Sequence, residues 1–231
     1  MRIPIISLCL FVSTLVASQT INQLDANGKR DGIWKKYFDD TKILRYEGEF
    51  SHGKEIGLFK FYKNVADKAS LTATKQFNEK DTKAYVIFYT SMGKVVSEGE
   101  MNGKMYVGAW KYYQKTSNKL LTLENYNESG LLDGDRFVYY ENGQVAEIKH
   151  YENGKLQGKS VWYSENNVVL KEFVYANDQL HGPSKYYNSK GELIIEGQYK
   201  NDKKSGIWNY YEGGKLTNEK DFTYYSKPKK K

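Results

Sequence analysis

The chain has 231 residues, of which 39% are hydrophobic and 15% aromatic, including 21 tyrosines. This aromatic content excludes a disordered chain, which lacks the apolar side chains needed to offset the entropy of ordering. The formal charge is +7, but lysine and glutamate alternate along the chain instead of gathering in one stripe, so we expect no nucleic-acid binding.

The N-terminus carries the features of an export signal. A short basic start is followed by an apolar run over residues 3–17, and Val16 and Ser18 stand at −3 and −1 of a cleavage point before Gln19. The apolar run is shorter than the ~20 residues that span a bilayer. We therefore assign 1–18 to a signal peptide, 19–225 to a repeat array and 226–231 to a basic disordered tail. The expected location is the periplasm, the outer surface or the exterior. The only cysteine, Cys9, lies in the signal, so disulfides and thiol catalysis are not expected.

An aromatic unit recurs through the rest of the chain. In its clearest copy a glycine precedes alternating rings, as in Gly206-Ile-Trp208-Asn-Tyr210-Tyr211. Intervals of 20 to 50 residues are typical of repeat architectures. Eight repeats are predicted, and the copy at 64–90 departs most from the others. The last tyrosine of each copy is Tyr37, Tyr62, Tyr89, Tyr113, Tyr140, Tyr163, Tyr187 or Tyr211.

A second element between these units alternates bulky and polar residues, as in Leu193 to Tyr199. A period of two predicts strands with one buried and one wet face. Asn-Gly pairs such as Asn153-Gly154 favour hairpin turns, and an inserted residue at Gly134-Asp135 shifts the register of one repeat. We predict an all-β fold: an elongated single-layer antiparallel sheet of about eight β-hairpin repeats and about sixteen strands, with essentially no helix after the signal peptide.

Two structural roles are expected for the repeated residues. The glycine that heads each aromatic strand, such as Gly57 or Gly206, is predicted to lie under a ring, and enlarging it would cost about 2–5 kcal/mol. A row of glutamates and a row of lysines predict cross-strand ion pairs on the polar face, with an acidic functional row as the alternative. The residues are Glu47, Glu98, Glu172, Glu196 and Glu219, with Lys35, Lys60, Lys111 and Lys185.

The stretch Tyr46-Glu47-Gly48-Glu49-Phe50, followed by Gly53-Lys54 and Gly57, resembles a MORN repeat, and Tyr139 to Gly143 resembles its bacterial variant. The resemblance covers about 25–225 and implies a hairpin sheet with a scaffold role. Bacterial proteins built of such repeats are often assigned to a YwqK-type antitoxin family, which implies neutralisation of a toxin by binding. An immunity protein located in the envelope is compatible with the export signal.

No catalytic, metal-binding or cofactor-binding constellation stands out, because His52, His150 and His181 lie apart and no ligand or nucleophile motif occurs. We expect a non-enzymatic scaffold with no small-molecule substrate that binds a protein, either a toxin or an envelope component. Aromatic platforms also suit carbohydrate, so a glycan- or membrane-surface-binding protein is the alternative. The candidate contact residues are Trp34, Tyr37, Trp110, Tyr112, Trp208 and Tyr210.

Overall fold

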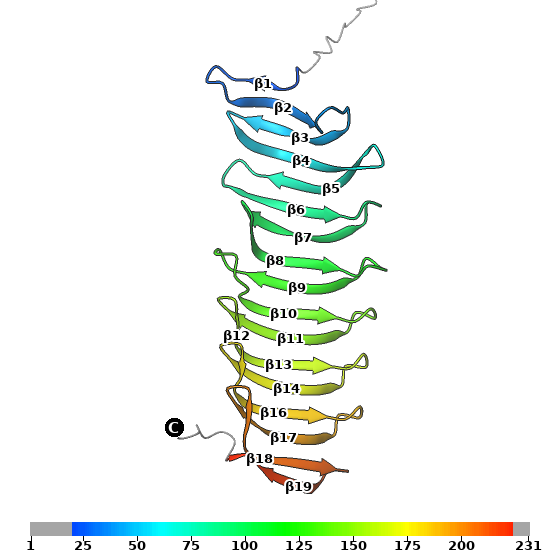
Figure 1. Cartoon of the computed structure of the whole chain (residues 1–231), viewed down its shortest axis with the longest axis vertical. Coiled ribbons are helices and arrows are strands. Elements are labelled where there is room, and N and C mark those ends of the chain that lie inside the picture. The colour runs from blue at the N-terminus through cyan, green and yellow to red at the C-terminus, as the bar shows by residue number, and fades with distance from the viewer. Residues whose placement is uncertain (1–19, 224–231) are drawn as a thin grey trace, which may run out of the picture.

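The computed structural model describes residues 20–223, which form one open antiparallel sheet of nineteen strands without an α-helix (Figure 1). The strands follow one another in chain order from one end of the sheet to the other. The predicted all-β, single-layer hairpin array is therefore confirmed. The expected signal peptide, 1–18, and tail, 226–231, lie outside the described residues.

Sixteen full strands make up the sheet, as the repeat count predicts. Three further segments have two residues each: β1 stands at the N-terminal end, while β12 and β15 lead into β13 and β16. The strands are β1 (Gln23–Leu24), β2 (Arg30–Tyr37), β3 (Leu44–Ser51), β4 (Lys54–Val65), β5 (Lys68–Phe77), β6 (Lys83–Tyr89), β7 (Val95–Asn102), β8 (Met105–Tyr113), β9 (Leu120–Tyr126), β10 (Gly134–Tyr139), β11 (Val145–Glu152), β12 (Lys155–Leu156), β13 (Gly158–Tyr163), β14 (Val169–Ala176), β15 (Gln179–Leu180), β16 (Gly182–Tyr187), β17 (Leu193–Lys200), β18 (Lys203–Glu212) and β19 (Lys215–Asp221).

Two kinds of turn connect the strands. Asn153 and Gly154 have φ angles of 47° and 83°, the two successive positive values that a two-residue hairpin turn requires. Asn142-Gly143 differs, because only Gly143 has a positive φ and its N–H donates to the Tyr140 carbonyl at 2.9 Å. The prediction from Asn-Gly pairs is thus correct for the turn position and only in part for the backbone conformation.

The most deeply buried rings pack against glycines of neighbouring strands. Trp110 and Trp208 are 0% exposed, and a Cβ built on Gly99 or Gly197 would lie 2.6 or 2.3 Å from the respective indole. A Cβ on Gly206, by contrast, would meet nothing within 4 Å.

The predicted role of the heading glycines is therefore wrong, since no ring lies over Gly57 or Gly206. Their φ angles of +63° and +67° show that glycine supplies a left-handed backbone there. The glycine that lies against the ring is instead in the preceding strand, as for Gly197 beside Trp208.

Farther along the sheet, the large and small residues of this packing layer change places. Phe173 takes the place of the packing glycine, and the adjacent ring positions hold Ser160 and Ser184, which are 0% and 1% exposed. A large side chain beside two small ones keeps the total volume of the layer, the property that packed cores conserve.

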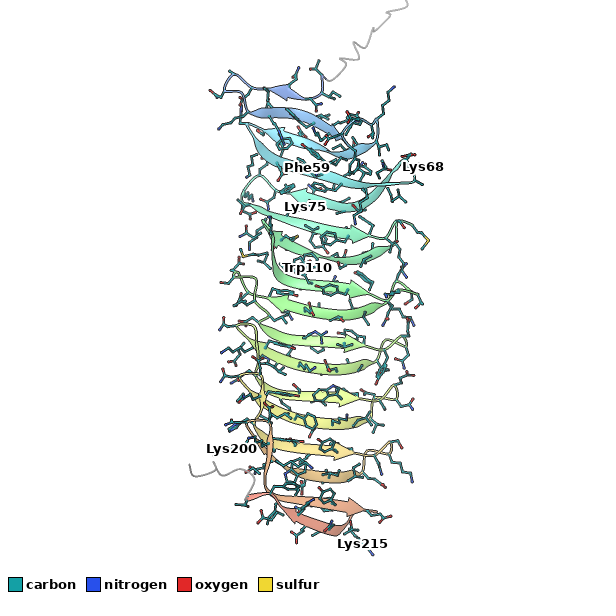
Figure 2. All side chains as sticks on the ribbon, in the orientation of Figure 1. Phe59, Lys68, Lys75, Trp110, Lys200 and Lys215 are labelled. Atoms are coloured by element: carbon teal, nitrogen blue, oxygen red, sulfur yellow. The ribbon has the colours of Figure 1, made fainter. Side chains whose placement is uncertain are left out.

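The two faces of the sheet differ in chemistry. We call the face that bears Phe59, Trp110 and Trp208 the aromatic face; Figure 2 shows Phe59, Lys75 and Trp110 along it. We call the opposite face, which bears Lys35 and Glu47, the ladder face. Some of the expected ion pairs occur on the ladder face: Glu47 lies 3.4 Å from Lys35 and 3.7 Å from Lys60, and Glu98 lies 3.9 Å from Lys111. Glu172 differs from the prediction, because it pairs with Lys159 at 2.6 Å.

Candidate protein-binding surface

The three tryptophans among the candidate contact residues occupy equivalent positions. The indole Nε1–H of each donates to a backbone carbonyl: Trp34 to Gln23 at 3.0 Å, Trp110 to Glu100 at 2.7 Å and Trp208 to Gln198 at 3.2 Å. Trp34 is half-buried near the N-terminal end, whereas Trp110 and Trp208 have no exposed surface. In this conformation those two rings pack the sheet and leave a partner nothing to touch.

Tyr112 and Tyr210 lie in a different row of the aromatic face. Cross-strand pairing joins Tyr112 to Ser97 on one side and to Thr122 on the other. From Phe61 to Tyr112, and again from Trp162 to Tyr210, rings alternate with other side chains, which places successive rings two strands, or about 10 Å, apart. We call this set the aromatic row; all its members are half-buried: Phe61, Phe88, Tyr112, Trp162, Tyr186 and Tyr210.

Tyr37 lies apart from that row. A bulge between Lys36 and Tyr37 ends the regular pairing, and Tyr37 is 40% exposed. In a later repeat the equivalent Tyr62 donates its hydroxyl to Glu47 of the ladder face at 3.0 Å. The structure thus brings Tyr112 and Tyr210 together in one row and places Tyr37 on the side of the ladder face.

The aromatic row is interrupted at Val138, beside a group of four charged residues that we call the charged cluster: Glu124, Arg136, Glu147 and Lys149. Arg136 Nε lies 2.9 Å from Glu124 Oε1, and Arg136 Nη1 lies 3.1 Å from Glu147 Oε1. Lys149 Nζ lies 3.0 Å from Glu147 Oε2. The cluster is neutral overall, and each charge has an opposite partner.

Hydrogen bonding around Glu124 shifts the titration of its neighbours. Burial alone would lower the pKa of Arg136, but the hydrogen bond and the charge of Glu124 outweigh it and raise that pKa. Burial and the hydrogen bond that Tyr126 donates to Glu124 at 2.6 Å raise the pKa of the Tyr126 hydroxyl. Glu124 therefore accepts hydrogen bonds from two side chains, Arg136 and Tyr126.

The strands that carry the charged cluster on the aromatic face carry apolar residues on the ladder face. Phe137 precedes its Tyr-Tyr pair as Trp110 does, yet it pairs with Leu123 and Ile148, and Ile148 pairs with Val161. A one-residue slip moves each side chain of a strand to the opposite face. The extra residue that the sequence shows near Gly134 accompanies this exchange. We call Leu123, Phe137, Ile148 and Val161 the apolar strip. Sequence reasoning missed both it and the charged cluster.

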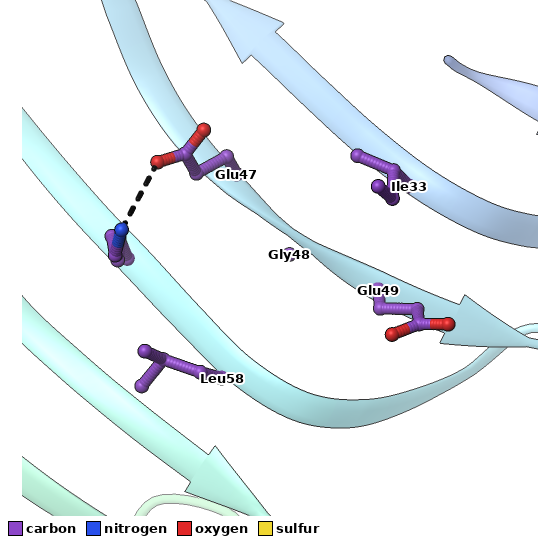
Figure 3. A pocket seen from close by; sticks show the side chains of 6 residues that line it. Ile33, Glu47, Gly48, Glu49 and Leu58 are labelled. Carbon is purple, nitrogen blue, oxygen red and sulfur yellow. Dashed lines mark ion pairs between the residues drawn. The ribbon is translucent and has the colours of Figure 1, made fainter. Parts of the chain in front are cut away.

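The depressions on the surface are shallow and follow the repeat. One of 340 Å³ lies on the ladder face, lined by Ile33, Glu47, Glu49, Leu58 and Lys60 around Gly48, with the Glu47–Lys60 ion pair across it (Figure 3). Within residues 20–223, no group of three or more His, Cys, Asp or Glu is placed to hold a metal ion. In the same range, no helix has the length and apolarity needed to cross a membrane.

The fold and its surfaces define the chain as a β-hairpin repeat scaffold. Residues 132–153 and 180–201 match the MORN repeat variant family, and these segments contain the hairpins β10–β11 and β16–β17. These two segments of the chain are therefore similar to MORN-variant repeats. No curated protein matches the chain.

Proposed function

We propose that the chain is a non-catalytic scaffold that binds another protein along the aromatic row. MORN repeats commonly bind proteins or membranes, and the row is the observation that carries the choice of surface. Its rings are half-buried, so each is held rigidly by its neighbours and still offers contact area.

The chemistry of the row suits a protein partner. Tyrosine, tryptophan and arginine dominate binding hot spots, because they combine large contact area with polar atoms. Small side chains such as Ala73, Ser97 and Thr122 separate successive rings and leave room for side chains of the partner. Arg136 and Lys149 of the charged cluster supply donors where the rings are interrupted.

The sharper form of the proposal is an immunity-type protein that neutralises a toxin by binding. The resemblance to the YwqK-type antitoxin family supports it, and the segment 1–18 supports action in the envelope or outside the cell. We expect a neighbouring gene to encode a toxin. Co-expression of this chain should abolish the toxicity. If no toxin is found, the chain acts as an adaptor between envelope proteins.

Recovery of a partner from the envelope is the direct test. The tagged chain lacking 1–18 is expected to retain one protein in stoichiometric amount from envelope extracts. Retention on a polysaccharide column or on lipid vesicles, with no protein recovered, would overturn the proposal and favour glycan or membrane-surface binding.

Export is tested separately by cell fractionation. The full chain is expected outside the cytoplasm in a form shortened at Gln19, and a chain that lacks 1–18 is expected to stay inside. An unshortened full chain in the cytoplasm would contradict the location.

A further inference from the structure

The ladder face carries one continuous line of directly paired residues, with a single residue from each full strand. Its centre is the apolar strip, bounded by Lys111 on one side and Glu172 on the other. Lys111 pairs with Leu123, and Val161 pairs with Glu172. Beyond these residues the line continues with Glu98 on the N-terminal side and Lys185 on the C-terminal side.

Charges at equal distances from the centre of this line have opposite signs. Counted outward from the midpoint between Phe137 and Ile148, Lys111 stands at the same distance as Glu172. One strand farther out, Glu98 stands at the same distance as Lys185. Near the ends, Lys60 corresponds to Glu219 in the same way. No two like charges correspond.

We propose that the ladder face binds a second copy of the chain, face to face, about a two-fold axis parallel to the strands at this midpoint. The long axes of the two sheets then run in opposite directions. The half-buried Leu123, Phe137 and Ile148 of the two apolar strips meet at the centre, next to the buried Val161. Lys111 of each copy faces Glu172 of the other. Glu98 likewise faces Lys185. A two-fold interface requires such a self-complementary surface.

The charges select this axis over the other face-to-face arrangement. A two-fold axis along the length of the sheet would place each residue opposite itself, with lysine on lysine and glutamate on glutamate. Like charges across an interface are strongly unfavourable. The charge pattern therefore favours a second copy of the chain bound in the antiparallel arrangement.

The available area is sufficient for a stable dimer. From Glu98 to Lys185 the line crosses eight full strands, which at ~4.8 Å per step span about 34 Å. Six residues of each strand cover about 20 Å, so each copy contributes roughly 700 Å², close to the ~800 Å² per partner of standard interfaces. Packed sheets cross at about 30°, which concentrates the contact at the centre, where the apolar strip lies.

A charge-swap cycle tests the arrangement. The variants are Lys111→Glu, Glu172→Lys and the double variant, with Lys36→Glu as control, because Lys36 is exposed on the aromatic face. Within one chain, residues 111 and 172 lie five strand steps, about 24 Å, apart. This exceeds the screening length of about 8 Å, so any compensation in the double variant arises between chains.

Analytical ultracentrifugation of the chain lacking 1–18 gives the dimer dissociation constant. We expect a dimer for the parent chain and for Lys36→Glu, at least about tenfold weaker dimers for each single swap, and recovery in the double variant. A monomer at all concentrations would overturn the proposal. So would a dimer that the single swaps leave unchanged, or one that the double variant fails to restore.

Discussion

The indole ring of Trp208 lies against the backbone of Gly197, so closely that a Cβ on Gly197 would come within 2.3 Å of Trp208 Cδ2. The same relationship joins Trp110 to Gly99 and Phe59 to Gly48. A ring that is 0% exposed can withdraw only by displacing its own neighbours. The packing of the sheet therefore depends on these glycines.

Gly197→Ala is expected to lower the free energy of unfolding by about 2–3 kcal/mol, the cost of overpacking a core. Gly206→Ala is the matched control, because its φ is +67° but no atom lies within 4 Å of its Cβ position. Strain alone predicts a loss of about 1–2 kcal/mol there. Urea unfolding measures both values, and a larger loss for Gly206→Ala would contradict the assignment.

Arg136→Leu is expected to lower the free energy of unfolding by about 2–3 kcal/mol, because it leaves Glu124 and Glu147 without their partner in a partly buried site. The Arg136 side chain is 25% exposed, so the loss lies below that of a fully buried pair. As a control, Lys159→Ala removes a 2.6 Å ion pair of a 59% exposed side chain and should cost less than about 1 kcal/mol. Equal losses in the two variants would contradict the role of the cluster.

Glu47→Gln tests the hydrogen bonds of the ladder face. Burial, together with the hydrogen bond to Glu47, raises the pKa of Tyr62 from 10.0 to about 12, so the variant should lower that pKa. NMR with ring-labelled tyrosine measures it. Burial alone would raise the pKa of Glu47, but its hydrogen bonds with Tyr62 and Lys35 outweigh burial and lower that pKa below 4.5. Glu47 therefore contributes stability above pH 4.5 that is lost as the pH falls, and the variant should lose less stability on acidification.

His52 is expected to titrate above 6.5. Its Nδ1 lies 2.8 Å from Asp25 Oδ2, and this hydrogen bond raises the pKa of His52 and lowers that of Asp25 from 3.8. The contribution of His52 to stability is complete below pH 6.5 and is lost as the pH rises through the raised pKa. That of Asp25 is present above pH 3.8 and is lost as the pH falls. NMR titration should show the pKa of His52 falling in Asp25→Asn. An unchanged value would contradict the contact.

Much of the fold could be predicted from the sequence, because the same spacing of aromatic, glycine and charged residues recurs in eight copies. The alternation from Leu193 to Tyr199 predicts a strand, and the spacing of Lys35, Glu47 and Lys60 predicts paired charges, which the register confirms. These features depend on local spacing, which one chain displays fully.

The features that could not be predicted depend on which residues of neighbouring strands pack against each ring. The sequence shows both Gly197 and Gly206 near Trp208, but only the cross-strand packing reveals that Gly197 lies under the ring. The burial of Trp110 likewise results from neighbours on other strands. The side change of Phe137 follows from a slip of one residue, whose consequence appears only when the strands are paired.

The affinity of the captured partner for two tyrosine variants tests the proposed binding surface most directly. Tyr210→Ala removes a ring of the aromatic row, whereas Tyr85→Ala removes a tyrosine that is 44% exposed elsewhere on the sheet. With both variants folded by circular dichroism, we predict at least about tenfold weaker binding for Tyr210→Ala, as for a hot-spot residue, and unchanged binding for Tyr85→Ala. Weaker binding for Tyr85→Ala together with unchanged binding for Tyr210→Ala would contradict the assignment of the aromatic row.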